Sequence, residues 1–183
     1  MKKAILVGML ALAACGSEDD GGGEPLASET EQRLAELKDA MAKYREPAAA
    51  EAAGFVAMGE CVESPEGGMG VHYVHPEKSM AAPRWDDPSM LLYVLQDGEL
   101  VLGGVEYFQP VIVDGQPYTG PETEPPPAEV AAQAPELFEG KPFDGPMPGH
   151  EPGMPWHFDQ HVWLFVENPA GLFAPWNPAV GCE

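Results

Sequence analysis

The fold is decided by residues 91–108, LLYVLQDGELVLGGVEYF, in which two apolar runs flank the dipeptide Asp97-Gly98. An Asp-Gly pair between two such runs is a strong signal for a β-hairpin, because the common type I′ turn needs a positive φ at both of its central residues. We therefore predict antiparallel strands over Leu91–Leu95 and Leu100–Phe108. Working outward, strands are also predicted at Phe55–Val62, Val71–Val74 and Trp156–Val166.

A capping-box pattern formed by Ser28 and Glu31 marks the start of a helix. Apolar residues then recur at helical spacing, which predicts an amphipathic helix over residues 29–46. These residues are Leu34, Leu37, Met41 and Tyr44. Pro47 either kinks this helix or opens a second, shorter one that ends at Gly54.

Together these elements predict an α+β fold in which the N-terminal amphipathic helix packs on a small, mainly antiparallel sheet. The segment at about 114–155 is expected to be a long loop, because it is rich in proline and glycine. Loops of this length are usually functional lids or disordered segments. We assign residues 28–183 to a single domain that contains this loop.

The first fifteen residues predict where in the cell the protein is located. Lys2 and Lys3 precede the apolar run Ala4–Ala14, which is too short for a membrane span and has the proportions of a secretory signal peptide. Its end, Leu12-Ala13-Ala14-Cys15, resembles the lipobox of bacterial lipoproteins.

That resemblance implies that residues 1–14 are removed and that Cys15 carries acyl chains, such as palmitate, that anchor the protein to a membrane. Residues 15–27 would form a flexible acidic tether. Because Gly16 follows the cysteine, the resemblance also implies the outer membrane if the cell has two membranes, and the outer face of the cell membrane otherwise.

The charge of the chain excludes several kinds of partner. The chain has 30 acidic and 9 basic residues, for a formal net charge of -21. Loss of Lys2 and Lys3 with the leader would leave seven basic residues and a formal charge of -23. Nucleic acid and anionic lipid surfaces would be repelled, so the predicted membrane contact is the lipid anchor alone. No particular protein or small-molecule partner follows from the sequence.

Two cysteines remain after Cys15, namely Cys61 and Cys182. Thiols outside the cytoplasm tend to be oxidised, so we predict that these two form a disulfide. Free thiols or a cysteine metal ligand are the alternatives.

Glu106 is unusual because the alternation of a strand places it on the same face as Leu100, Leu102 and Phe108. A buried carboxylate needs a partner, and the mature chain has few cations to supply one. We therefore predict a metal site formed by His72, Glu106 and His161, with Asp159 as a supporting residue. Two imidazoles and one carboxylate suit a zinc or iron ion that keeps one coordination position open. The alternative is a buried ion pair of Glu106 with Arg84 or Arg45.

A second candidate site lies in the proline- and glycine-rich segment. It combines thioethers with imidazoles, which favours copper, especially Cu(I). Its residues are Met147, His150, Met154 and His157. The alternative is that these methionines only cover the sheet.

Parts of the body resemble an uncharacterised family of exported bacterial proteins, over about residues 35–182. The resemblance is carried by six short runs: Gly59–Val62, Met69–Tyr73, Val105–Phe108, His161–Leu164, Asn168–Gly171 and Trp176–Pro178. It implies no activity, ligand or catalytic residue.

The function predicted from these observations is a lipid-anchored protein of the cell envelope that binds a transition metal or a small ligand. The first alternative is an interaction or structural module without metal, whose exposed aromatic residues Trp156, Trp163 and Trp176 meet a partner. A metal-dependent enzyme that uses the site of His72, Glu106 and His161 comes third. Whether the chain is an enzyme is left open.

Overall fold

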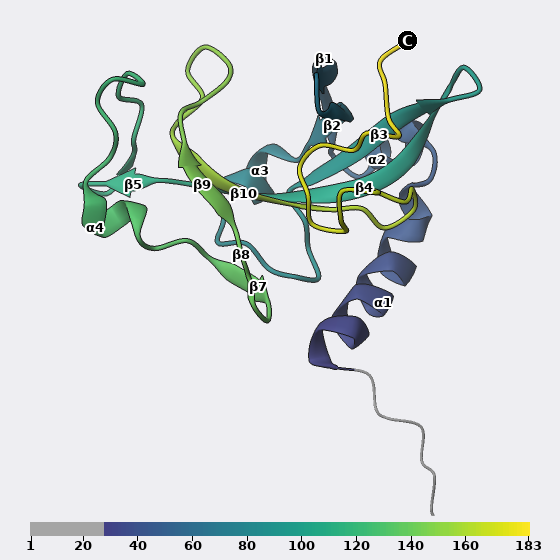
Figure 1. Ribbon diagram of the computed structural model, residues 1–183, viewed down its shortest axis with the longest axis horizontal. Helices are drawn as coiled ribbons and strands as arrows, with labels where there is room; N and C mark the ends of the chain where they lie inside the picture. The colour runs from purple at the N-terminus through teal and green to yellow at the C-terminus, as the bar shows by residue number, and fades with distance from the viewer. Residues whose placement is uncertain (1–27) are drawn as a thin grey trace, which may run out of the picture.

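The computed structural model describes residues 28–183, so the predicted signal peptide, the lipidated Cys15 and the acidic tether lie outside the described residues. The fold is α+β, as predicted: an N-terminal helix accompanies a six-stranded sheet that curls into a half-barrel (Figure 1). Every pairing in this sheet is antiparallel. Its order is β1 (Val56–Ser64), β2 (Gly67–Val74), β3 (Met90–Gln96), β4 (Glu99–Pro110), β10 (His157–Val162) and β9 (Asp144–Met147).

The hairpin that joins β3 and β4 turns at Asp97 and Gly98, whose φ angles are 52° and 85°. Both are positive, as a two-residue turn with this twist requires. The hairpin prediction from the Asp-Gly pair is therefore confirmed.

A β-bulge interrupts the pairing of β3 with β4. Leu92 pairs with Gly104, whereas Tyr93 pairs with Leu102, so Gly103 is an extra residue on β4. An extra residue inverts the alternation of side chains beyond it. Leu102 consequently packs in the main core, on the opposite face of the sheet from Glu106. The prediction that Leu100 and Leu102 share a face with Glu106 is wrong, because it assumed an unbroken alternation.

The predicted helix over 29–46 is present as α1 (Glu29–Met41), followed by one turn of 3₁₀ helix at Ala42–Tyr44. Its capping box is formed: Ser28 Oγ accepts from the N–H of Glu31, and the Glu31 carboxylate accepts from the N–H of Ser28. Pro47 opens the second helix, α2 (Pro47–Ala52), and Gly54 follows it with a φ of 94°.

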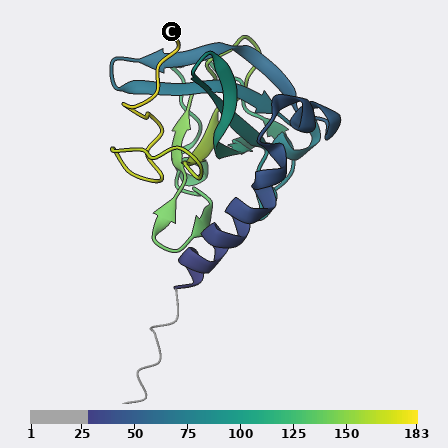
Figure 2. The same ribbon diagram turned by 90° about the vertical axis from the view of Figure 1, so that its right-hand side faces the viewer.

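The main core lies between α1 and one face of the sheet. Leu37 and Met41 of α1 pack there with Tyr93, Tyr107 and other apolar residues of the central strands. Figures 1 and 2 show α1 on one side of the sheet and the C-terminus on the other. In the described residues, α1 therefore packs on the face of the sheet opposite the concave face that carries Glu106.

The segment predicted as a loop is mostly irregular but contains short elements. These are β6 (Gln116–Pro117), α4 (Ala128–Ala131), β7 (Glu136–Phe138), β8 (Lys141–Pro142) and β9. Two further short elements lie before this segment, namely α3 (Pro76–Ser79) and β5 (Ile112–Val113). Phe138 and Phe143 from this segment are buried in the main core. Within the described residues, no helix is long and apolar enough to cross a membrane.

The last strand, β10, ends at Val162, earlier than predicted, because the amide of Trp163 donates to Leu172 outside the sheet and those of Phe165 and Val166 both donate to Gly103 at the bulge. The indole N–H of Trp163 donates to the carbonyl of Ala174, and only 3% of Trp163 is exposed. Trp156 is 6% exposed. Both tryptophans are therefore core residues, and the prediction that they form an exposed aromatic surface is wrong.

The C-terminal tail returns to the β1–β2 hairpin. Asn177 and Gly68 exchange two backbone hydrogen bonds, and the predicted disulfide joins Cys61 of β1 to Cys182 across a separation of 121 residues. The amide of Cys182 also donates to the carboxylate of Glu63. The disulfide therefore closes most of the domain into one loop and ties β1 to the tail.

We expect the double variant Cys61→Ser, Cys182→Ser to have a free energy of unfolding lower by about 2–5 kcal/mol, because its unfolded chain loses a long covalent loop. Urea titration followed by circular dichroism measures this difference. A reductant should cause a similar loss in the natural chain and none in the variant. Equal stability of the oxidised and reduced chains would contradict the structural role of the disulfide.

Candidate metal centre

Three strands of the sheet bring one potential metal ligand each to the concave face. His161 of β10 lies directly opposite Glu106 of β4 in the pairing register. His72 of β2 pairs with Leu92 of β3, and Met90, two residues earlier on β3, pairs with Glu106. All of these positions share a face, and the curl of the sheet lets His72 reach Glu106 across β3.

The three side chains converge on one point, as the sequence predicted. Nε2 of His72 lies 3.1 Å from Oε2 of Glu106, and Nε2 of His161 lies 3.7 Å from the same oxygen. One ligand atom from each residue falls within 4.8 Å of the others. Ligand atoms around a tetrahedral zinc ion are about 3.4 Å apart, so small shifts of these side chains would let the site hold one.

The cluster is buried and its hydrogen bonding is incomplete. Glu106 is 4% exposed and His161 is 1% exposed. Among the described residues, neither ring nitrogen of His161 has a hydrogen-bond partner, and Oε2 of Glu106 makes only the ion-pair contacts with His72 and His161. Buried polar atoms of native proteins nearly always have partners, so orphaned atoms gathered at one point favour a bound ion there.

The electrostatics of the cluster also suit a cation. Burial raises the pKa of Glu106, but the charges of His161 and His72 and the close approach of His72 outweigh it and lower the pKa to about 2. Burial lowers the pKa of His161 from its ordinary value, against the attraction of Glu106. Glu106 is therefore ionised beside the two imidazoles at neutral pH, and a metal ion would bind those imidazoles in their neutral form.

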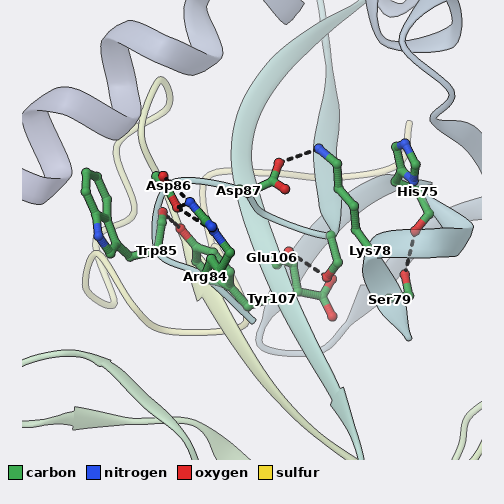
Figure 3. Close-up of polar contacts among 10 residues, drawn as sticks. His75, Lys78, Ser79, Arg84, Trp85, Asp86, Asp87, Glu106 and Tyr107 are labelled. Atoms are coloured by element: carbon green, nitrogen blue, oxygen red, sulfur yellow. Dashed lines mark hydrogen bonds and ion pairs between the residues drawn. The ribbon is translucent and has the colours of Figure 1, made fainter. Parts of the chain in front are cut away.

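Glu106 does not form the ion pair with arginine that was its alternative interpretation. The guanidinium of Arg84 binds the carboxylate of Asp86, and that of Arg45 lies over the ring of Phe165. Figure 3 shows Arg84 joined to Asp86 and Lys78 joined to Asp87, with neither cation joined to the carboxylate of Glu106. The partners of that carboxylate are the two histidines.

Asp159 lies next to the cluster, as predicted for a supporting residue. Its Oδ1 is 4.0 Å from Nδ1 of His161, and its Oδ2 is 3.8 Å from Nε2 of His157. Burial, together with the negative charges of Glu106 and Asp144, raises the pKa of Asp159 to about 8. Asp159 could therefore accept a hydrogen bond from Nδ1–H of His161, and so orient that ring, once a bound cation favours the ionised form of Asp159.

The residues of the second predicted site line the same hollow as the first. A cavity of about 840 Å³ is lined by the cluster and by Met147, His150, Met154 and His157. The rings of His150 and His157 are 5.3 Å apart, but Nδ1 of His157 is bonded to the carbonyl of Pro155, and its ring stacks on Phe108. The structure thus brings the four residues to one wall.

Sequence reasoning missed three further methionines of this cavity, Met58, Met69 and Met90. Two of them are paired with residues of the cluster, since Met58 pairs with His72 and Met90 with Glu106. Their position beside the cluster is visible only from the register of the strands. The composition, with nine methionines in 183 residues, was the one sequence signal that methionines could matter.

No protein-family model matches this chain, and comparisons with curated proteins and with solved structures also find no match. The resemblance to exported bacterial proteins therefore stays a prediction, and the case for function rests on the geometry of the site.

Because the pKa of Asp159 is raised, the folded metal-free protein binds its proton more tightly than the unfolded chain does. The stability that this proton contributes is present at low pH and is lost as the pH rises through about 8. We expect the melting temperature of chelator-treated protein to fall between pH 7 and 8.5, and this fall to be much smaller in Asp159→Asn.

Differential scanning calorimetry across that range measures the effect. The other shifted groups of the cluster titrate lower, since the pKa values of His157, His161 and Glu106 are lowered. A fall of equal size in the variant and the natural chain would show that Asp159 is not the buried group responsible.

Proposed function

We propose that this protein is a lipid-anchored component of a bacterial cell envelope that binds one divalent transition-metal ion through His72, Glu106 and His161. The observation that carries the proposal is the convergence of three ligand atoms from three strands, two of them on the buried residues Glu106 and His161, at a point where their hydrogen bonding is incomplete. Holding these atoms together without an ion costs desolvation, so a fold that does so is best explained by an ion that compensates.

The ligand set favours zinc or ferrous iron. Two imidazoles and one carboxylate on one side of an ion leave one or more positions open, as in catalytic zinc sites and non-haem iron sites. Copper is the alternative if the ion is held on the wall of Met147, His150, Met154 and His157, because thioethers prefer Cu(I). Mutual distances within 4.8 Å support the first set, His72, Glu106 and His161.

The disulfide between Cys61 and Cys182 indicates an oxidising location outside the cytoplasm. The finer assignment, a lipid anchor on Cys15 and the outer membrane, is part of the proposal and is supported by the lipobox pattern of the leader. The N-terminal end of α1 and the C-terminal tail lie at opposite ends of the domain (Figures 1 and 2). Since Pro175 and Trp176 of that tail line the cavity, an anchored domain would open away from its tether.

The chemistry that the site would support is Lewis-acid activation of a bound water or ligand at the open position. This makes a metal-dependent enzyme the natural extension of metal binding. The competing proposal, a metal-free interaction module, loses two of its three exposed tryptophans, because Trp156 and Trp163 are buried.

We expect the metal-free protein to bind one equivalent of Zn²⁺, and both His72→Ala and His161→Ala to weaken that binding more than about 100-fold, since each removes a direct ligand. Isothermal titration calorimetry with chelator-treated, tag-free protein measures the affinity. His150→Ala is the matched control, because it removes an exposed imidazole from the same cavity, and it should keep the natural affinity.

Two results would overturn the assignment. If His72→Ala and His161→Ala both bind zinc as the natural chain does, the cluster is not the site. If His150→Ala instead loses the metal, the site is the Met/His wall. Circular dichroism of each variant establishes that its fold is intact.

A further inference from the structure

The cavity over the cluster is far larger than a metal ion requires. Its volume of about 840 Å³ lies in the range of about 300–1,000 Å³ that is typical of sites for small organic molecules. The ion would occupy only its floor, where Glu106, Asp159 and His161 are buried. The remaining space is therefore large enough for an organic ligand.

The walls of this space are apolar and adaptable. Methionines from four strands and from the loop after β9 surround it, together with Val62, Pro175 and Trp176. The methionines are Met58, Met69, Met90, Met147 and Met154. Thioether side chains have several rotatable bonds and make favourable contacts with aromatic rings, so such walls fit apolar bodies of varied shape.

The charge of the cavity has one sign. Glu60, Glu63 and Glu151 are exposed and line it, which places carboxylates around its mouth, while Glu106 and Asp159 line its floor. None of the seven Lys and Arg residues within 28–183 lines it. An anionic ligand would be repelled, whereas a cation would be attracted at the mouth.

The cations of the described chain are held elsewhere, which keeps the field of the cavity negative. Six of them lie over aromatic rings outside the cavity, and the seventh, Arg84, is bonded to Asp86. The six are Arg33, Lys38, Lys43, Arg45, Lys78 and Lys141. On the floor, the buried Oδ1 of Asp159 has no hydrogen-bond partner in residues 28–183, and Oε2 of Glu106 contacts the two histidines of the cluster.

We propose that the cavity binds an organic cation, namely an amine with an aromatic or branched aliphatic body. The body packs between the methionines and Trp176, and the ammonium group faces the carboxylates of Glu60, Glu63 and Glu151. This inference goes beyond metal binding, because the walls and the acidic mouth are present whether or not the floor holds an ion.

The test uses three probes on the purified domain, in metal-free and zinc-loaded form. The first is 2-(1-naphthyl)ethylamine, which has both an apolar body and a positive charge. The second, 3-(1-naphthyl)propionate, has the same body with a negative charge, and ethylamine has the charge without the body. Calorimetry should give an affinity for the naphthyl amine at least tenfold higher than for either of the other two.

A pair of matched variants locates the binding. Glu60→Gln, Glu151→Gln removes two carboxylates of the mouth and should weaken binding of the naphthyl amine severalfold. Glu99→Gln, Glu124→Gln removes the same charge from exposed positions outside the cavity and should leave the affinity unchanged. This contrast separates the cavity from the general attraction of an acidic surface.

Equal affinities for the naphthyl amine and ethylamine, tighter binding of the propionate, or equal effects of the two double variants would each overturn the inference. Its failure is distinct from failure of the metal site. Binding of the amine by a domain that takes up no zinc leaves the inference in place and removes the proposed function. Uptake of zinc without binding of the amine removes the inference alone.

Discussion

The structure depends on the pairing of β4 with two neighbours at once. The register with β10 sets His161 opposite Glu106, and the register with β3 sets Met90 opposite the same residue. Because of the bulge at Gly103, Leu102 points into the core beneath α1, whereas Glu106 points to the concave face. Without that extra residue, one face of β4 would have to serve both as core and as site.

The concave face gathers groups that destabilise a fold when they have no partners. A carboxylate and two imidazoles meet there away from water, and a second carboxylate, Asp159, lies 4.0 Å from one of those imidazoles. Burying such groups is unfavourable unless something binds them, and sites that sacrifice stability in this way are usually functional. The aromatic core beneath α1 supplies stability on the other side of the sheet, and the disulfide supplies it where β1 meets the C-terminal tail.

Much of this arrangement was predictable from residue patterns. The Asp97-Gly98 turn, the capping box at Ser28 and the pairing of Cys61 with Cys182 follow from local chemistry and compartment, and the structure has all three. Glu106 was identified because a chain so poor in cations offers a buried carboxylate few partners. The face of Leu102 could not be predicted, because a bulge depends on which residues oppose each other across two strands.

The relation between the two predicted sites also depends on tertiary structure. Nothing local to Met147 or His150 indicates that β9 pairs with β10 and brings that loop to the cavity above Glu106. For the same reason, the acidic mouth and the methionine walls become visible only when strands far apart in sequence are placed side by side. Burial of Trp156 likewise depends on a distant partner, the carbonyl of Gly120.

The most direct test of the central claim is anomalous X-ray scattering from crystals of the zinc-loaded protein, recorded on both sides of the zinc absorption edge. The account predicts one strong peak about 2.0–2.2 Å from Nε2 of His72, Nε2 of His161 and Oε2 of Glu106. A peak on the wall of Met147 and His150, or peaks only among exposed carboxylates, would contradict it.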